Sequence, residues 1–323
     1  MSNQGLIFDT AKRTLAIEVE TLQALHDSLD ASFAAVVDLV HTCKGRVVVT
    51  GVGKSALVAQ KIAATLNSTG TPSLFMHGAD AIHGDLGMIQ DNDIVIALSK
   101  SGETSEMRAL LPLVRRLGNT IVAMVSKPES YLALQADHVL MTPVRKEADL
   151  HNLAPTASAI SQMAMGDALA TSLTALRGFQ PEDFAQYHPG GSLGKRMFMQ
   201  LGDLGCRNEC PMVTPNASLE QVVVEMTTKR LGATAVVDAN DDLIGIITDG
   251  DLRRALGRGV EVVRLSAKQL MSPAPRTLMV TDLAVKGLEL LQKHNISQLL
   301  LTDAKGKYSG MVHIHDFVRE GLE

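Results

Sequence analysis

The stretch Ser99-Lys100-Ser101-Gly102-Glu103-Thr104-Ser105 decides how the first half of this chain folds. It follows an apolar run over residues 93–98 and opens a helical pattern. A strand that enters a glycine-containing turn at a helix start predicts an anion site, because the first N–H groups of a helix have no partners and carry its positive dipole end. Capping of the helix by one hydroxyl is the alternative interpretation. The hydroxyl donors expected at a bound phosphate are Ser99, Ser101, Thr104 and Ser105, and Gly102 lets the backbone come close to it.

Strand-like apolar runs alternate with helical patterns on both sides of this stretch. Two amphipathic helices come first, between Asp9 and Cys43, and a long helix rich in Ala, Ser and Gly ends at Arg177. The alternation predicts an α/β fold with a doubly wound parallel sheet, whose ligand site lies at the carboxyl ends of the strands. The expected strands cover residues 46–50, 72–76, 93–98, 120–125 and 138–141.

A second glycine turn, Gly51-Val52-Gly53-Lys54-Ser55, follows the first strand. It lacks the spacing of a P-loop, and it matches the dinucleotide fingerprint only in a relaxed form without the acidic partner. A lysine at a helix start opposes the helix dipole, so an anionic ligand would explain Lys54. A solvated surface lysine is the alternative.

Two histidines lie in turns of the first part of the chain. His83 belongs to a polar segment over residues 77–87, and His188 precedes Pro189-Gly190-Gly191. Each fits an acid–base role or a structural hydrogen bond. Spacing alone favours the structural hydrogen bond for His83, and the rigid turn slightly favours a functional role for His188.

The last third of the chain contains an internal repeat. Residues 245–254 align with residues 310–319 at an offset of 65, and the offset extends to a helix-strand-strand-helix unit. Two copies predict a paired module in which each copy covers the other's apolar face. The preceding segment, residues 197–211, is typical of a linker.

Composition excludes several classes of protein. The 323 residues are 46% hydrophobic but only 3% aromatic, and their formal net charge is −5. These values argue against a nucleic-acid-binding face and against a polybasic membrane surface. Cys206 and Cys210 lack further ligands at zinc-site spacing, so no metal site is expected. Three cysteines and no leader-like segment predict a cytoplasmic protein.

Seven motifs together resemble known families. The first part resembles the sugar isomerase (SIS) domain, a flavodoxin-like sandwich, and the repeat resembles a tandem α+β CBS pair. The combination is similar to the D-arabinose 5-phosphate isomerase family. We divide the chain accordingly into a SIS domain (1–200) and two CBS repeats (201–266 and 267–323). The matching motifs are Gly51–Ser55, Ser68–Pro72, His83–Gly87, Ser101–Glu106, Leu153–Thr156, Met165–Leu169 and His188–Gly191.

The resemblance implies an activity and a site. It implies interconversion of D-ribulose 5-phosphate and D-arabinose 5-phosphate, the first step toward Kdo for lipopolysaccharide, by a homotetramer that needs no cofactor. The implied catalytic residues are Lys54, Glu106, Glu147 and His188. The implied substrate-binding residues are Gly53, Ser55, His83, Ser99, Ser101, Gly102 and Thr104.

The chemistry assigns roles to these residue types. A base must move a carbon-bound proton between C1 and C2 of an enediol, and a carboxylate can do so if burial raises its pKa. We take Glu147 as this base and keep Glu106 as the alternative. Lys54 would stabilise charge on the carbonyl oxygen, and His188 would open the sugar ring or move hydroxyl protons.

The CBS repeat and the rival functions leave alternatives open. Thr248 and Asp251 resemble the ribose and phosphate contacts of a nucleotide, whereas the second copy keeps Asp316 but has His313 in place of the threonine. A regulatory nucleotide or nucleotide-sugar and a purely structural pair are both compatible with this pattern. An isomerase of another sugar phosphate, or a non-catalytic sugar-phosphate sensor, remains the alternative for the whole protein.

Overall fold

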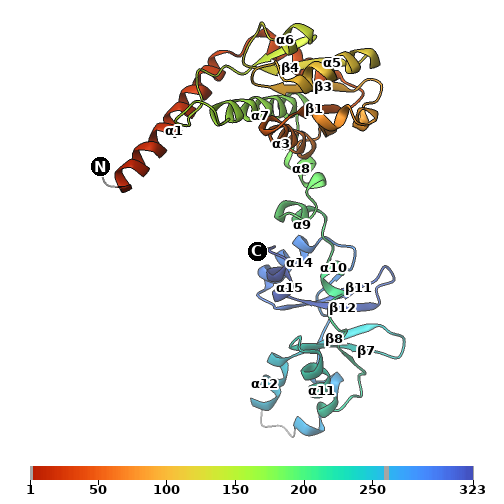
Figure 1. The fold of residues 1–323 in the computed structure, drawn as a ribbon. Coiled ribbons are helices and arrows are strands. Elements are labelled where there is room, and N and C mark those ends of the chain that lie inside the picture. Colours follow the sequence, from red (N-terminus) through yellow and green to blue (C-terminus); the bar gives the residue numbers. More distant parts are fainter. Residues whose placement is uncertain (1–2, 258–261, 323) are drawn as a thin grey trace. The chain divides into compact units, whose positions relative to one another are not determined.

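A computed structural model describes residues 3–257 and 262–322 (Figure 1). The chain divides into two compact units, Met1–Tyr187 and His188–Glu323. Within the described ranges, no helix combines the length and the apolar run that crossing a bilayer would need.

The first unit contains the predicted parallel sheet. Five strands pair in the order β2-β1-β3-β4-β5, and every pairing is parallel. Each expected strand is confirmed to within one residue, because runs of Val, Ile, Leu and Ala suit strands that are covered on both faces. The strands are β1 (Val47–Gly51), β2 (Ser73–His77), β3 (Ile94–Ser99), β4 (Thr120–Val125) and β5 (His138–Met141).

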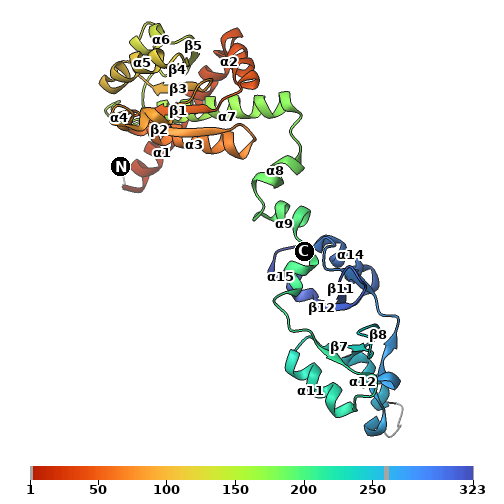
Figure 2. The same cartoon turned by 90° about the vertical axis from the view of Figure 1, so that its right-hand side faces the viewer.

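Helices cover both faces of this sheet, which makes a three-layer doubly wound sandwich (Figure 2). One apolar core joins the sheet to α2 (Ala31–Thr42), α3 (Lys54–Ser68) and α7 (Ala157–Arg177). The opposite core joins it to α5 (Ser105–Leu117) and to the shorter helices beside it. The remaining elements are α1 (Asn3–Asp27), α4 (Gly78–Ala81), η1 (Asp85–Met88), α6 (Tyr131–Gln135) and α8 (Pro181–Tyr187).

The strand order fixes where a ligand can bind. The chain leaves β1 toward β2 on one side and later returns to β3 on the other side. In open α/β sheets of this order, the crevice at the switch between β1 and β3 is the ligand site. The two glycine turns that the sequence singled out follow these two strands.

The second unit contains two copies of one helix-strand-strand-helix unit, as the repeat predicts. Ala233, Ala235 and Val237 of the first copy pack against Leu300 and Met311 of the second, so each copy covers the other's apolar face. The first copy comprises α11 (Leu219–Lys229), β7 (Ala233–Val237), β8 (Leu243–Thr248) and α12 (Asp249–Gly257). The second comprises α14 (Ala284–His294), β11 (Gln298–Thr302), β12 (Tyr308–His313) and α15 (Ile314–Arg319).

Short elements complete the two sheets of this unit. The four-stranded sheet has the order β6-β7-β8-β9, and the three-stranded sheet has the order β10-β11-β12. Their edge elements and connections are α9 (Ser192–Phe198), β6 (Met212–Val213), η2 (Val262–Arg264), α13 (Ala267–Leu270), β9 (Ser272–Pro273) and β10 (Thr277–Met279).

One expectation for this unit is wrong. The segment predicted as a linker contains α10 (Leu201–Gly205), whose Leu201 and Leu204 are buried in the core of the second copy. The five-residue helix carries two glycines, so its apolar pattern is too short to stand out in the sequence.

Candidate active site

A cavity of about 200 Å³ lies at the carboxyl ends of β1 and β3. It brings together five residues that the sequence analysis assigned to substrate or catalysis, together with Lys100 and Pro155, which it did not assign. The assigned residues that line it are Lys54, Ser55, Ser99, Ser101 and Thr104.

The turn after β3 presents an open helix N-terminus. The N–H of Gly102 donates to the Ser99 hydroxyl (3.1 Å), and the N–H of Glu103 donates to the Ser101 hydroxyl (3.2 Å). Thr104 is the N-cap residue of α5, but its side chain makes no capping hydrogen bond. The first turn of α5 therefore keeps N–H donors for an anion, which favours the phosphate interpretation over simple capping.

Gly102 is required by the shape of this turn. Its φ is +68°, and a Cβ atom on it would lie 2.1 Å from the Ser130 hydroxyl oxygen. Any other residue would be strained in the backbone and would clash.

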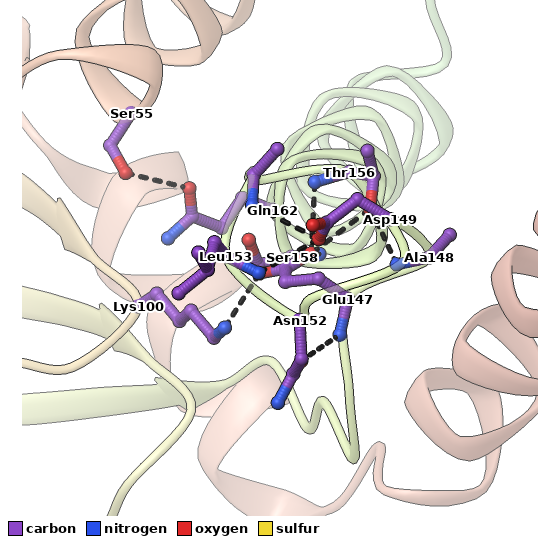
Figure 3. A network of polar contacts seen from close by, with 11 residues as sticks. Ser55, Lys100, Glu147, Ala148, Asp149, Asn152, Leu153, Thr156, Ser158 and Gln162 are labelled. Carbon is purple, nitrogen blue, oxygen red and sulfur yellow. Dashed lines mark hydrogen bonds and ion pairs between the residues drawn. The ribbon is translucent and has the colours of Figure 1, made fainter.

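The turn after β1 supplies the opposite wall of the cavity. Gly53, with a φ of +60°, precedes α3, and the exposed Lys54 is the first residue of that helix. The Ser55 hydroxyl donates to Oε1 of Gln162 on α7 (3.1 Å; Figure 3). Gln162 is buried, and its Nε2 has no hydrogen-bond partner among the described residues. An amide donor that the protein leaves unused thus lies beside the cavity wall.

Glu147 is a buried carboxylate that donors from different parts of this unit hold in place. It is 2% exposed, and its Oε1 accepts a hydrogen bond from Lys100 Nζ at 2.6 Å. Its Oε2 accepts from the backbone N–H groups of Thr156 (2.8 Å) and Ser158 (3.1 Å), at the start of α7. Figure 3 shows Lys100 and the start of α7 meeting at this carboxylate from different sides.

This environment overturns the expectation that burial raises the pKa of Glu147. Burial does raise it, but hydrogen bonds from Lys100, Ser158 and Thr156 outweigh burial and lower the pKa to about 2. The ionised carboxylate gains an ammonium group and helix N–H donors, all of which favour the charged form. The partners come from distant parts of the chain, so no local pattern in the sequence signals them.

The other predicted residues are not among those that line the cavity: Gly53, His83, Gly102, Ser105, Glu106, Glu147 and His188. Glu106 lies in the first turn of α5, where its own N–H and then the Ser105 hydroxyl hold its pKa below the usual range. His83 is exposed in the turn between α4 and η1. His188 is the first residue of the second compact unit.

The predicted nucleotide residues occupy equivalent turns of the second unit. Thr248 and Asp251 line a cleft of about 530 Å³, in which the Thr248 N–H and hydroxyl donate to the Asp251 carboxylate (2.8 and 2.6 Å). In the second copy the N–H of His313 donates to Asp316 at 2.8 Å, and His313 lines a separate cleft of about 540 Å³. In neither unit do three His, Cys, Asp or Glu side chains of the described residues come together as a metal site.

Comparison with known proteins places both units in families. The SIS domain family matches residues 40–172, and the CBS domain family matches residues 201–258 and 267–323. Arabinose 5-phosphate isomerase KdsD of Pseudomonas aeruginosa is 44% identical over 99% of both chains. KdsD of Escherichia coli K12 is 43% identical over 98% of this chain and 97% of its own.

A solved structure adds a bound sugar phosphate in a relative. The structure of Escherichia coli CFT073 c3406 in complex with arabinose 5-phosphate is 42% identical, with a TM-score of 0.57. It covers 58% of this chain and all of its own.

Proposed function

We propose that this chain, which belongs to the arabinose 5-phosphate isomerase family of SIS–CBS proteins, interconverts D-ribulose 5-phosphate and D-arabinose 5-phosphate. The observation that carries the proposal is the cavity at the β1/β3 switch point, where an uncapped helix start meets Lys54 and the Lys100–Glu147 pair. A sugar phosphate needs these two parts, an anion cradle and a charged group beside it.

The cradle explains how the substrate would be held. Its phosphate would accept hydrogen bonds from the first-turn N–H groups of α5 and from the hydroxyls of Ser99, Ser101 and Thr104. Binding the phosphate at one end leaves C1 and C2 to be positioned by the remaining wall of the cavity.

The reaction is a proton transfer without net oxidation. A base takes a proton from C1 of the ketose while the C2 carbonyl oxygen gains a proton, which gives the enediol. The protonated base then returns a proton to C2 while the C1 hydroxyl gives up its proton, the counterpart of the one that the C2 oxygen gained, so that the C1 oxygen becomes the carbonyl of the aldose. We assign the proton shuttle to Glu147 and the stabilisation of the developing oxyanion to Lys54, with His188 assisting ring opening.

The direct test follows turnover of D-ribulose 5-phosphate by NMR in deuterated water after chelator treatment. We expect D-arabinose 5-phosphate with deuterium at C2, because the shuttle exchanges its proton with solvent. Binding of pentose phosphates without turnover would instead support a sensor, and turnover of another sugar phosphate alone would support a different isomerase.

Two variants test the choice of base. We expect Glu147→Gln to lower kcat at least about 100-fold, because an amide cannot accept the carbon-bound proton. Phosphate binding should persist in this variant. If Glu106→Gln abolishes exchange at C2 while Glu147→Gln keeps it, Glu106 is the base.

The exposed face of α1 supports assembly into a homotetramer. Ile17, Thr21 and Leu25 are buried, whereas Leu15 (61% exposed) and Val19 (66%) lie exposed on another face. Large apolar side chains grouped on a surface helix are typical of subunit interfaces. Light scattering should give the mass of four chains, and the variant with both Leu15→Glu and Val19→Glu should give a smaller one.

Two further assignments rest on chemistry. We place the protein in the cytoplasm, where its three free cysteines stay reduced, and its product at the first step of Kdo formation for lipopolysaccharide.

The cleft at Thr248 and Asp251 would take a nucleotide or nucleotide-sugar. Thermal stabilisation by a nucleotide that is lost in Thr248→Val would support this ligand, and no stabilisation would support a structural pair.

A further inference from the structure

Lys100 belongs to two sites at once. Its side chain lines the cavity beside Ser99 and Ser101, whose turn would hold the phosphate. Its Nζ also donates to Oε1 of the buried Glu147 at 2.6 Å. Lys100 therefore contacts the Glu147 carboxylate and also lies next to the turn where the substrate phosphate is expected.

The two members of this pair differ in freedom. The Lys100 side chain is 41% exposed, whereas that of Glu147 is 1% exposed. Glu147 keeps its position without the lysine, because Thr156 and Ser158 donate to its other oxygen. The ammonium group can leave, and the carboxylate stays in place.

A bound phosphate would compete for the lysine. At pH 7 a sugar phosphate carries a charge of about −1.5 to −2 and three acceptor oxygens, more than one carboxylate offers. Lys100 is a direct neighbour in sequence of two cradle serines, so its flexible stem can turn from one anion to the other.

We propose, on the basis of the function proposed above, that Lys100 holds the Glu147 carboxylate while the site is free and moves to the substrate phosphate when the sugar binds. Lys100 is thus a phosphate-binding residue and, through Glu147, a positioning residue. Its departure exposes Oε1 of Glu147 to the cavity at the moment when a proton acceptor is needed.

The exchange also explains how a strongly acidic carboxylate can act as a base. With Lys100 gone, the helix donors remain on Oε2. Arg13 of α1 also contacts this loop, but it donates to the Ala148 carbonyl and not to the carboxylate. Loss of the ammonium group raises the pKa of Glu147 from about 2 toward its ordinary range.

The first test measures binding of D-arabinitol 5-phosphate, an analogue without a carbonyl that the enzyme cannot turn over. We expect Lys100→Met to weaken binding about tenfold, since a charge-assisted hydrogen bond to phosphate is lost. Lys100→Arg should restore most of it. The matched control is Lys127→Met, which removes an exposed lysine from the segment after β4, outside the cavity. Equal affinities of Lys100→Met and Lys127→Met would overturn the proposal.

The second test is a double-mutant cycle with Glu147→Gln. If Glu147 holds Lys100 in the free protein, removing its charge should tighten analogue binding several-fold. The same substitution in the Lys100→Met background should have no such effect. An equal effect in both backgrounds would show that the two residues do not exchange, and circular dichroism checks that each variant folds. If Glu147→Gln does not fold, the comparison of Lys100→Met with Lys100→Arg and Lys127→Met still decides.

These outcomes separate this proposal from the proposed function. Turnover of D-ribulose 5-phosphate by the unmodified protein tests the isomerase, whereas analogue affinity tests Lys100. If analogue binding depends on Lys100 but the protein shows no turnover, the proposed isomerase activity is refuted, while the assignment of Lys100 to the phosphate is supported.

Discussion

The first and second units use a buried carboxylate to hold a helix start, but they build it differently. In the CBS pair, Asp251 accepts from the N–H three residues before it and from Arg254 three residues after it. Asp316 repeats this pattern with His313 and Arg319. In the SIS unit, Glu147 accepts from N–H groups nine and eleven residues later and from Lys100, 47 residues earlier.

The backbone donors of the CBS aspartates lie within a few residues of them in sequence, whereas the donors of Glu147 join distant parts of the chain. Each CBS aspartate stabilises the turn that contains it, and its arginine partner is mostly exposed. Glu147 ties the loop before α7 to the segment after β3, and its partner faces the ligand cavity. A change of ligand can therefore act on Glu147. Each CBS aspartate is held by its own turn together with one more distant donor, Ser272 for Asp251 and Asn208 for Asp316.

The largest expected effect is on Glu147→Ala. The substitution leaves the N–H groups of Thr156 and Ser158 without an acceptor and Lys100 without a partner. We expect the free energy of unfolding to fall by about 3 kcal/mol. Urea denaturation measures this decrease. If Glu147→Ala lowers the free energy of unfolding no more than Asp251→Ala or Asp316→Ala does, Glu147 and the CBS aspartates do not differ in the way argued above.

Acid should reduce the contribution of Glu147 to the free energy of unfolding over a defined pH range. The pKa of Glu147 is about 2 in the folded chain, compared with 4.5 ordinarily, so its ionised form stabilises the fold above pH 4.5. This contribution, up to about 3 kcal/mol, is lost as the pH falls from 4.5 toward 2. The difference in unfolding free energy between the natural chain and Glu147→Gln should be smaller at about pH 3 than at about pH 7. An unchanged difference would contradict the lowered pKa.

A smaller effect is expected for Asp316→Ala. The N–H of His313 loses its acceptor, as an N-cap does, and Asn208 keeps a second partner in the Met311 carbonyl. We expect a loss of about 1–2 kcal/mol. Asp251→Ala should cost a similar amount if the two copies are equivalent. Unequal losses in urea denaturation would show that the threonine or the histidine changes the device.

The smallest effect is expected for Arg319→Ala. The arginine side chain is 68% exposed, so solvent screens its pairing with Asp316. The loss should stay below about 1 kcal/mol and shrink at high salt. Urea denaturation at two salt concentrations measures this decrease. A decrease above about 1 kcal/mol would show that the exposed Arg319–Asp316 pair contributes substantially to the stability of the turn.

Much of the fold was predictable because its signals are local. The apolar runs predicted β1 and β3, and the offset of 65 predicted the paired CBS copies. The glycine turns could be placed at the same sheet edge because parallel strands end together. The sequence did not predict the helix α10, because five residues with two glycines are too few to show a helical pattern of apolar residues.

The site was predictable in its residues and less so in its contacts. Ser99, Ser101 and Thr104 stand in one turn, so their meeting follows from the chain itself. Lys100 received no role from the sequence, because its partner, Glu147, is 47 residues away. The direction of the Glu147 pKa was wrong for the same reason, since desolvation can be guessed from sequence but the donors that outweigh it cannot.

The burial of α10 has a consequence for synthesis. Leu201 packs against Gly287, where an added Cβ would lie 2.5 Å from Leu201 Cδ2, so its partner emerges from the ribosome 86 residues later. At roughly 5–20 residues per second, Leu201 waits roughly 4–17 s without the core that covers it. The apolar side chains of α10 therefore stay without the core that buries them throughout the translation of the first CBS copy.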